Sequence, residues 1–324
     1  MQNINKSDVG FVPVFKKSFL KPRHWGSWLA IGAFAAIALV PPRLRDPLLG
    51  SLGRFAGKFA HSARRRAQIN LLYCLPEVAE AQREKIIDDM FATAPQSMVM
   101  MAELALRPNK VRPRILWQGG EWVERLREAN ENVIFLVPHG WAIDIPAMVL
   151  ASEGQKIAAM FHHQRDPVMD YVWNRVRRRF GGRLHARHNG IKPFISSVRQ
   201  GYWGYYLPDE DHGPEHSEFV DFFATYKATL PALGRLMKVC RARVVPLFPV
   251  YDSKTHTLTI IVREPMDDLL EADDVTLARR MNEEVENFIR PNPEQYTWIL
   301  KLLKTRRPGE TEPNDRQELY PRKK

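Results

Sequence analysis

The stretch ENVIFLVPHGWAID, residues 131–144, decides how the rest of the chain is interpreted. An apolar, β-branched run over residues 133–137 is stopped by a proline, and His139 follows directly. The next residues, IPAMVLASEG, have helical character, so the pattern predicts a buried strand, a turn, and a helix that starts near Asp144. A histidine at the end of a strand, with a carboxylate nearby, is suited to activating a hydroxyl group. The imidazole takes the proton, and the carboxylate fixes its tautomer.

The spacing of His139 and Asp144 limits how the two can meet. Within one helix, residues five positions apart point about 140° away from each other. Pro138 and Gly140 favour a break in the backbone between the strand and the helix. We therefore predict that His139 precedes the helix, that Asp144 lies inside it, and that Asp144 orients the imidazole.

The chain after this stretch alternates between short apolar runs and helical stretches. The predicted strands are residues 133–137, 157–161, 203–207, 243–250 and 257–263. The predicted helices are residues 143–153, 166–179, 190–200, 228–241, 274–290 and 294–304, with a further helix upstream at 80–106. This rhythm is typical of an α/β protein with a mostly parallel central sheet flanked by helices.

The composition excludes several classes of protein. The 324 residues are 44% hydrophobic and 26% charged, which is ordinary for a folded globular protein. The two cysteines, Cys74 and Cys240, lie far apart in apolar surroundings, which argues against a disulfide scaffold and against a cysteine-rich zinc site. A reducing, cytoplasm-facing location fits this usage best.

The net charge of +11 is concentrated at one end of the chain. Residues 1–66 hold twelve Lys or Arg against two acids, and the remaining residues are nearly balanced. A nucleic-acid-binding protein more often spreads its basic residues over a folded face, so no nucleic-acid partner is expected. Here the charge brackets the apolar segment WGSWLAIGAFAAIALV, residues 25–40.

That apolar segment predicts a membrane-anchor helix. As a helix it spans ~24 Å, short of the ~30 Å hydrocarbon core, so it is either a tilted span or an interfacial helix. The alternative is a buried core helix. We divide the chain into a basic membrane anchor (1–66), a catalytic domain (67–305) and a polar tail (306–324). The bulk of the chain should lie on the cytoplasmic side, because it follows the more basic flank.

Three further blocks follow the first along the predicted sheet. They are VRRRFGGRLHARHNG (176–190), which includes Arg177 and Arg187; YYLPDEDHGP (205–214), which includes Asp209 and Asp211; and the apolar strand ARVVPLFPV (242–250). The block at 176–190 contains several arginines around a glycine pair. The block at 205–214 places two aspartates in a turn at the end of a strand. Each block is weak evidence alone, but the four in this order are specific.

This order of blocks resembles the glycerolipid-type H-x4-D acyltransferase superfamily, and more closely the late acyltransferases of lipid A biosynthesis. The resemblance covers nearly the whole chain, including LPDEDHGPEHSEFVDFF and PEQYTWILKLLKTRRPG. It implies transfer of a fatty acyl chain, with myristoyl favoured, from acyl carrier protein to a lipid A precursor in the bacterial inner membrane. The acceptor group would be the hydroxyl of a 3-hydroxyacyl chain on the Kdo-bearing precursor.

The resemblance also implies roles for individual residues. His139 would be the general base and Asp144 its partner, whereas Arg177, Arg187, Asp209 and Asp211 would bind substrate. Arg177 suits either the developing oxyanion or a lipid phosphate. No metal and no cofactor are implied, because the acyl carrier protein thioester is a co-substrate.

The chain departs from the family pattern at two points. Asp144 stands where many late acyltransferases carry Glu, so the geometry around the imidazole must be tighter. The segment FHHQRDP (161–167) lacks the Tyr-Arg-Pro often found there, and Arg165 is the nearest substitute for the missing guanidinium.

The sequence lacks the motifs of several other classes of enzyme. The histidines at 162–163, 185–188 and 212–216 lack the HExxH or cysteine-rich spacing of a zinc enzyme. No G-x-S-x-G elbow of a serine hydrolase occurs, and GSLGRFAG (50–57) has the wrong spacing for a dinucleotide fold. A phospholipid or lysophospholipid acyltransferase and a non-catalytic, membrane-anchored protein that binds anionic lipid remain as alternatives.

Overall fold

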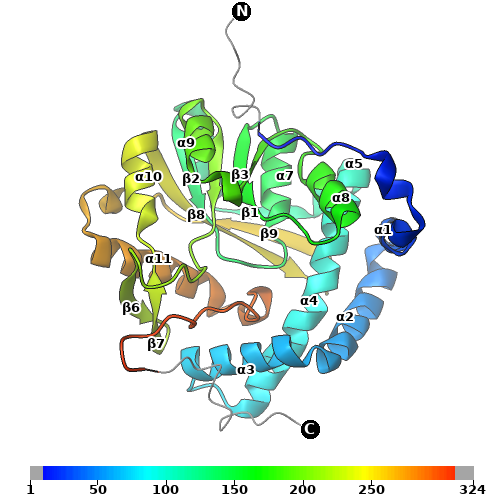
Figure 1. Ribbon diagram of the computed structural model, residues 1–324, viewed down its shortest axis with the longest axis horizontal. Helices are drawn as coiled ribbons and strands as arrows, with labels where there is room; N and C mark the ends of the chain where they lie inside the picture. The colour runs from blue at the N-terminus through cyan, green and yellow to red at the C-terminus, as the bar shows by residue number, and fades with distance from the viewer. Residues whose placement is uncertain (1–9, 311–324) are drawn as a thin grey trace, which may run out of the picture.

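A computed structural model of the protein describes residues 10–310 (Figure 1). At its centre lies a seven-stranded sheet in the order β1-β9-β8-β2-β5-β3-β4. Its strands are β1 (Ile115–Gln118), β2 (Asn132–Leu136), β3 (Ile157–Phe161), β4 (Arg183–Ala186), β5 (Trp203–Tyr206), β8 (Ala242–Asp252) and β9 (Thr257–Val262). All neighbours in this sheet pair in parallel except β8 and β9, which are antiparallel.

Helices cover both faces of the sheet. They are α6 (Gly120–Glu128), α7 (Asp144–Ser152), α8 (Pro167–Arg177), α9 (Lys192–Arg199), α10 (Ala232–Cys240) and α11 (Asp274–Ile289). Strand β2 shows why two layers form. Val133, Phe135 and Val137 pack with residues of α6 and α7, whereas Ile134 and Leu136 pack with residues of α9, α10 and α11. The predicted α/β class with a mostly parallel sheet is confirmed.

Some elements differ from the sequence prediction. Strands β1 and β4 and the hairpin of β6 (Glu218–Phe222) and β7 (Thr225–Thr229) were not predicted, because none of them offers the continuous apolar run that marked β2, β3 and β5. The predicted helix at 294–304 was wrong: one 3₁₀ turn, Pro293–Gln295, is followed by irregular backbone. There the Asn70 side chain donates hydrogen bonds to the carbonyls of Trp298 and Leu300, at 2.6 and 2.8 Å, and so replaces helical partners.

The N-terminal part of the chain forms a peripheral layer of helices (Figure 1). They are α1 (Trp25–Leu39), α2 (Pro42–Phe59), α3 (His61–Cys74), α4 (Glu80–Leu106) and the short α5 (Pro108–Val111). Both α1 and α2 pack along the long helix α4. Between Gly10 and Glu310, no helix has the length and apolar character needed to cross a membrane. The spanning form of the predicted anchor is therefore not supported; α1 has 15 residues, and its Ala38 is buried.

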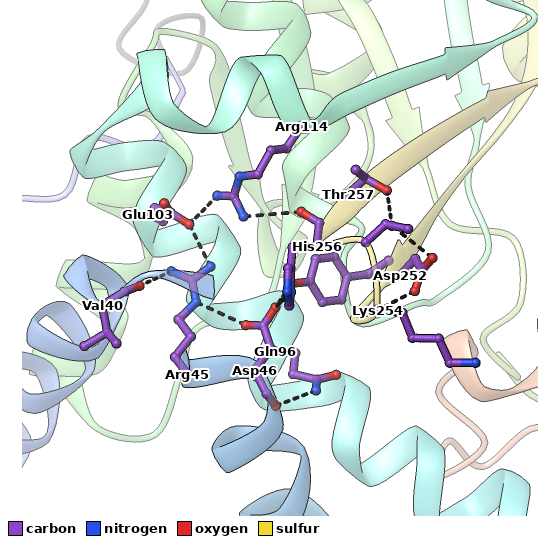
Figure 2. Close-up of polar contacts among 12 residues, drawn as sticks. Val40, Arg45, Asp46, Gln96, Glu103, Arg114, Asp252, Lys254, His256 and Thr257 are labelled. Atoms are coloured by element: carbon purple, nitrogen blue, oxygen red, sulfur yellow. Dashed lines mark hydrogen bonds and ion pairs between the residues drawn. The ribbon is translucent and has the colours of Figure 1, made fainter. Parts of the chain in front are cut away.

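A buried network of charges ties the helix α2 to the rest of the fold (Figure 2). Arg45, 2% exposed, donates to Glu103 of α4 at 2.7 Å. Its neighbour Asp46 accepts hydrogen bonds from the Tyr251 hydroxyl and from His256 Nδ1, the latter at 2.8 Å. Arg45, Asp46 and Glu103 are almost fully buried, so the N-terminal helices are a fixed part of the fold. The predicted division between residues 66 and 67 falls inside α3, and most of the predicted tail lies outside the described residues.

Candidate active site

His139 follows β2 at the carboxyl end of the parallel strands, where sites of α/β proteins are usually built. Its backbone is held from the C-terminal side of the chain. The His139 carbonyl accepts hydrogen bonds from the backbone N–H of Thr297 at 3.0 Å and from its hydroxyl at 2.8 Å. The next residue must be glycine, because a Cβ on Gly140 would lie 2.9 Å from the Phe248 ring and 3.1 Å from the Gln295 carbonyl.

Asp209 holds the imidazole of His139. One carboxylate oxygen lies 2.5 Å from His139 Nδ1, and the other accepts a hydrogen bond from the His139 backbone N–H at 2.8 Å. Asp209 is 1% exposed and follows β5, the strand next to β2. Because the carboxylate accepts the Nδ1 proton, the lone pair of the neutral ring is on Nε2.

The electrostatics around this pair favour its ionised form. Burial alone would raise the pKa of Asp209, but His139 and Lys227 outweigh burial and lower that pKa from 3.8 to about 2. Burial alone would lower the pKa of His139, but the Asp209 carboxylate outweighs it, so the pKa of His139 is raised above 6.5.

Lys227, on β7, supports the turn that carries Asp209. Its side chain is fully buried, and Nζ donates to the Asp209 carbonyl at 2.8 Å. Burial lowers the pKa of Lys227 despite the surrounding carboxylates. Sequence reasoning missed this residue, because a lone lysine in a short, irregular stretch carries no recognisable signal.

Asp144 contacts Arg177 rather than His139. Its two carboxylate oxygens accept hydrogen bonds from Arg177 Nε at 2.9 Å and Nη2 at 3.0 Å, a bidentate ion pair. Asp144 is the first residue of α7 and Arg177 the last of α8. The structure therefore corrects the expected pairing: Asp209, which we expected to bind substrate, orients the imidazole, and Asp144 holds an arginine.

The remaining predicted residues divide into two groups. Arg187 forms an ion pair with Glu210, whose Oε1 lies 3.6 Å from His139 Nε2, so Arg187 belongs to the site. Burial alone would raise the pKa of Glu210, but Arg187 and His139 lower it overall. Asp211 instead accepts hydrogen bonds from Thr305, from the backbone N–H at 2.6 Å and from the hydroxyl at 2.7 Å. Sequence reasoning missed Glu210, although it stands between the two predicted aspartates.

Two cavities lie beside the pair of Asp144 and Arg177. The smaller, about 80 Å³, is lined by both residues and by apolar side chains of α7 and β3. The larger, about 390 Å³, lies between α1, α4 and α8 and has an apolar lining that includes Phe34, Met98 and Trp173. The Arg177 guanidinium lies 5.8 Å from the ring centre of Trp173, which lines the larger cavity.

Over residues 10–310, no three His, Cys, Asp or Glu side chains are grouped as they would be around a metal ion. Several of the histidines noted in the sequence have other partners: His163 Nδ1 lies 2.8 Å from Asp170, and His185 Nε2 lies 2.9 Å from the Ser197 hydroxyl.

Comparison with known proteins shows the family to which the chain belongs. The family model described as "Bacterial lipid A biosynthesis acyltransferase" matches residues 12–305. The chain is 72% identical to the lipid A biosynthesis myristoyltransferase of Escherichia coli (strain K12), over 98% of both chains. It is 48% identical to a lipid A biosynthesis acyltransferase of Haemophilus influenzae, over 93% of this chain and 95% of the relative. The E. coli lipid A biosynthesis lauroyltransferase is 28% identical, over 92% of this chain and 97% of its own. The protein belongs to the lipid A biosynthesis acyltransferase family, whose members are O-acyltransferases that act late in lipid A assembly.

Proposed function

We propose that this protein transfers a myristoyl chain from acyl carrier protein to the hydroxyl of a 3-hydroxyacyl chain on a Kdo-bearing lipid A precursor. The choice of myristoyl is supported by the 72% identity to a protein named lipid A biosynthesis myristoyltransferase. The observation that carries the chemistry is the hydrogen bond between His139 Nδ1 and Asp209, which leaves Nε2 as a base.

The reaction follows from that arrangement. His139 Nε2 takes the proton of the acceptor hydroxyl as its oxygen attacks the thioester carbonyl. The new C–O bond forms, the C–S bond breaks, and the imidazolium returns its proton to the leaving thiolate. Asp209 stabilises the imidazolium between these two steps. Its pKa of about 2 keeps the carboxylate ionised throughout the reaction.

Arginines are proposed to receive the negative charges of the substrates. The bidentate contact with Asp144 orients Arg177 beside the small cavity, where it can contact the developing oxyanion or a lipid phosphate. Arg187 is proposed to contact a phosphate near Nε2, from its position beside Glu210. The basic character of the chain also suits an acidic carrier protein.

The proposed location is the cytoplasmic side of the bacterial inner membrane, where the lipid precursor and the carrier protein meet. In place of a span, we propose an interfacial role for α1. Its Trp25 and Leu29 are 63% and 76% exposed, and two basic residues, Lys21 and Arg23, precede it.

A turnover assay tests this function. Purified protein is incubated with myristoyl carrier protein and a radiolabelled Kdo-bearing precursor that already carries its laurate, and the product is separated by thin-layer chromatography. His139→Ala should abolish product, whereas His61→Ala, a change at an exposed histidine of α3, should not. Acylation of a lysophospholipid instead would favour the glycerolipid alternative. Lipid binding without turnover would favour the non-catalytic one.

A further inference from the structure

We propose that α2 lies flat in the lipid–water interface and inserts one apolar face into an anionic membrane leaflet. That face, here called the outer row, consists of Leu44, Leu48, Leu52, Phe55 and Phe59. This inference takes one point from the proposed function, namely that the acceptor is a membrane lipid. It adds the surface by which the protein reaches that lipid, in a helix outside the apolar segment at 25–40.

The outer row is exposed to an unusual degree. Its five side chains are between 60% and 71% exposed, and their spacing of three or four residues places them on one side of the helix. Soluble proteins expose single apolar side chains routinely, but a contiguous apolar stripe of this length marks an interaction surface. Trp25, Leu29 and Leu39 of the neighbouring helix α1 are also exposed.

The opposite face of α2 fixes its rotation. Gly50, Gly53 and Gly57 are buried against α4. A Cβ on Gly53 would lie 2.2 Å from the Phe91 carbonyl oxygen, and a Cβ on Gly57 would lie 2.6 Å from the Phe91 ring. No bulkier face of α2 fits there, so the outer row cannot turn inward. Its exposure is a property of the packed structure.

The charges around the outer row identify an anionic lipid surface as the partner. Arg43, Arg54 and Lys58 are exposed on α2, and Arg54 also forms an ion pair with Asp89 of α4 at 2.9 Å. The single acid of α2, Asp46, is fully buried in the network of Figure 2. An exposed helix surface with leucine, phenylalanine and cations but no exposed acid is typical of interfacial helices that bind anionic membranes.

The helix that precedes α2 lines the apolar cavity of about 390 Å³. That cavity lies between α1, α4 and α8, and α1 leads directly into α2. An apolar space on the helix before α2 suits a lipid partner better than a second copy of the chain.

The test uses full-length protein and removes apolar surface without adding charge. L48S/F55S is compared with wild type and with V239S/V275S, which removes exposed apolar side chains of α10 and α11, on the other side of the molecule in Figure 1. Binding is measured by flotation with vesicles of phosphatidylglycerol and phosphatidylcholine, and with phosphatidylcholine alone. We expect L48S/F55S to bind vesicles at least about tenfold more weakly than wild type, and the control to bind as wild type does. Wild-type protein should prefer the anionic vesicles, and salt should reduce that preference.

The outcomes separate this inference from the proposed function. Acyl transfer to a detergent-dispersed acceptor should be unchanged in L48S/F55S, while transfer to a vesicle-embedded acceptor should fall with binding. Equal vesicle binding by L48S/F55S and wild type would overturn the inference whatever the turnover assay gives. The inference would also be overturned if sedimentation showed that wild type is a dimer and L48S/F55S a monomer, while both bind vesicles equally well.

Discussion

Replacing Asp209 by Asn tests the central assignment of the site. The change keeps the size of the side chain but removes the charge that faces His139. The pKa of Asp209 lies near 2 instead of 3.8, which corresponds to about 2 kcal/mol in favour of the ionised carboxyl. Part of this preference comes from His139, so by reciprocity the carboxylate raises the pKa of the imidazole.

The pH profile gives the sign of the effect. A base must be neutral to act, so the acid limb of kcat/KM follows the pKa of His139 in the free enzyme. Without the carboxylate, burial lowers that pKa, so the acid limb should move toward lower pH. The plateau should fall ~10²- to 10⁴-fold, because the imidazolium is no longer stabilised and the Nδ1 tautomer is no longer fixed.

The assay is turnover of a detergent-dispersed acceptor across the acid range, with wild type and Asp211→Asn as controls. Asp211 contacts Thr305 rather than the imidazole, so its variant should keep the wild-type acid limb even if it is less stable. An unmoved acid limb in Asp209→Asn, or full activity at the plateau, would refute the assignment of Asp209 as the residue that orients the base.

Three further predictions concern the supporting structure. Glu103→Gln removes the anion between Arg45 and Arg114, so it should lower the free energy of unfolding by about 3–5 kcal/mol in urea; a loss below about 1 kcal/mol would contradict the buried network. Gly53→Val forces α2 away from α4, so it should destabilise by about 1–3 kcal/mol or more and speed proteolysis within α2, whereas Gly26→Val, with open space around it, should do neither. Arg177→Lys loses the bidentate contact with Asp144, so kcat/KM should fall about 10- to 100-fold. Arg175→Lys, on the exposed side of α8, serves as the matched control. Equal activity of the two variants would argue against a role for the bidentate contact.

The sequence predicted those parts of the fold whose pattern is long or strongly apolar. Helix α4 was predicted over its full length, 80–106, and β2 within one residue at each end. Strands β1 and β4 were missed although β5 is equally short, because neither ILWQ nor RLHA is a continuous apolar run.

The candidate site was located from the sequence, but its pairing was not. The position of His139 follows from β2 alone. Its partner Asp209 lies 70 residues further on and becomes a neighbour only because β5 pairs directly with β2. Proximity in sequence favoured Asp144 as the partner of His139. The strand order places Asp209 there instead, and a single sequence does not specify that order.

The contacts between His139 and Thr297 have a consequence for how the enzyme comes into being. The proposed base is encoded 158 residues before the hydroxyl that holds its carbonyl. Translation therefore completes the sheet, whose last strand ends at Val262, before it supplies this anchor, and a nascent chain that lacks Thr297 has a histidine without its support. Activity should emerge only after the segment around Thr297 has been made, so a shorter nascent chain is not expected to acylate lipid.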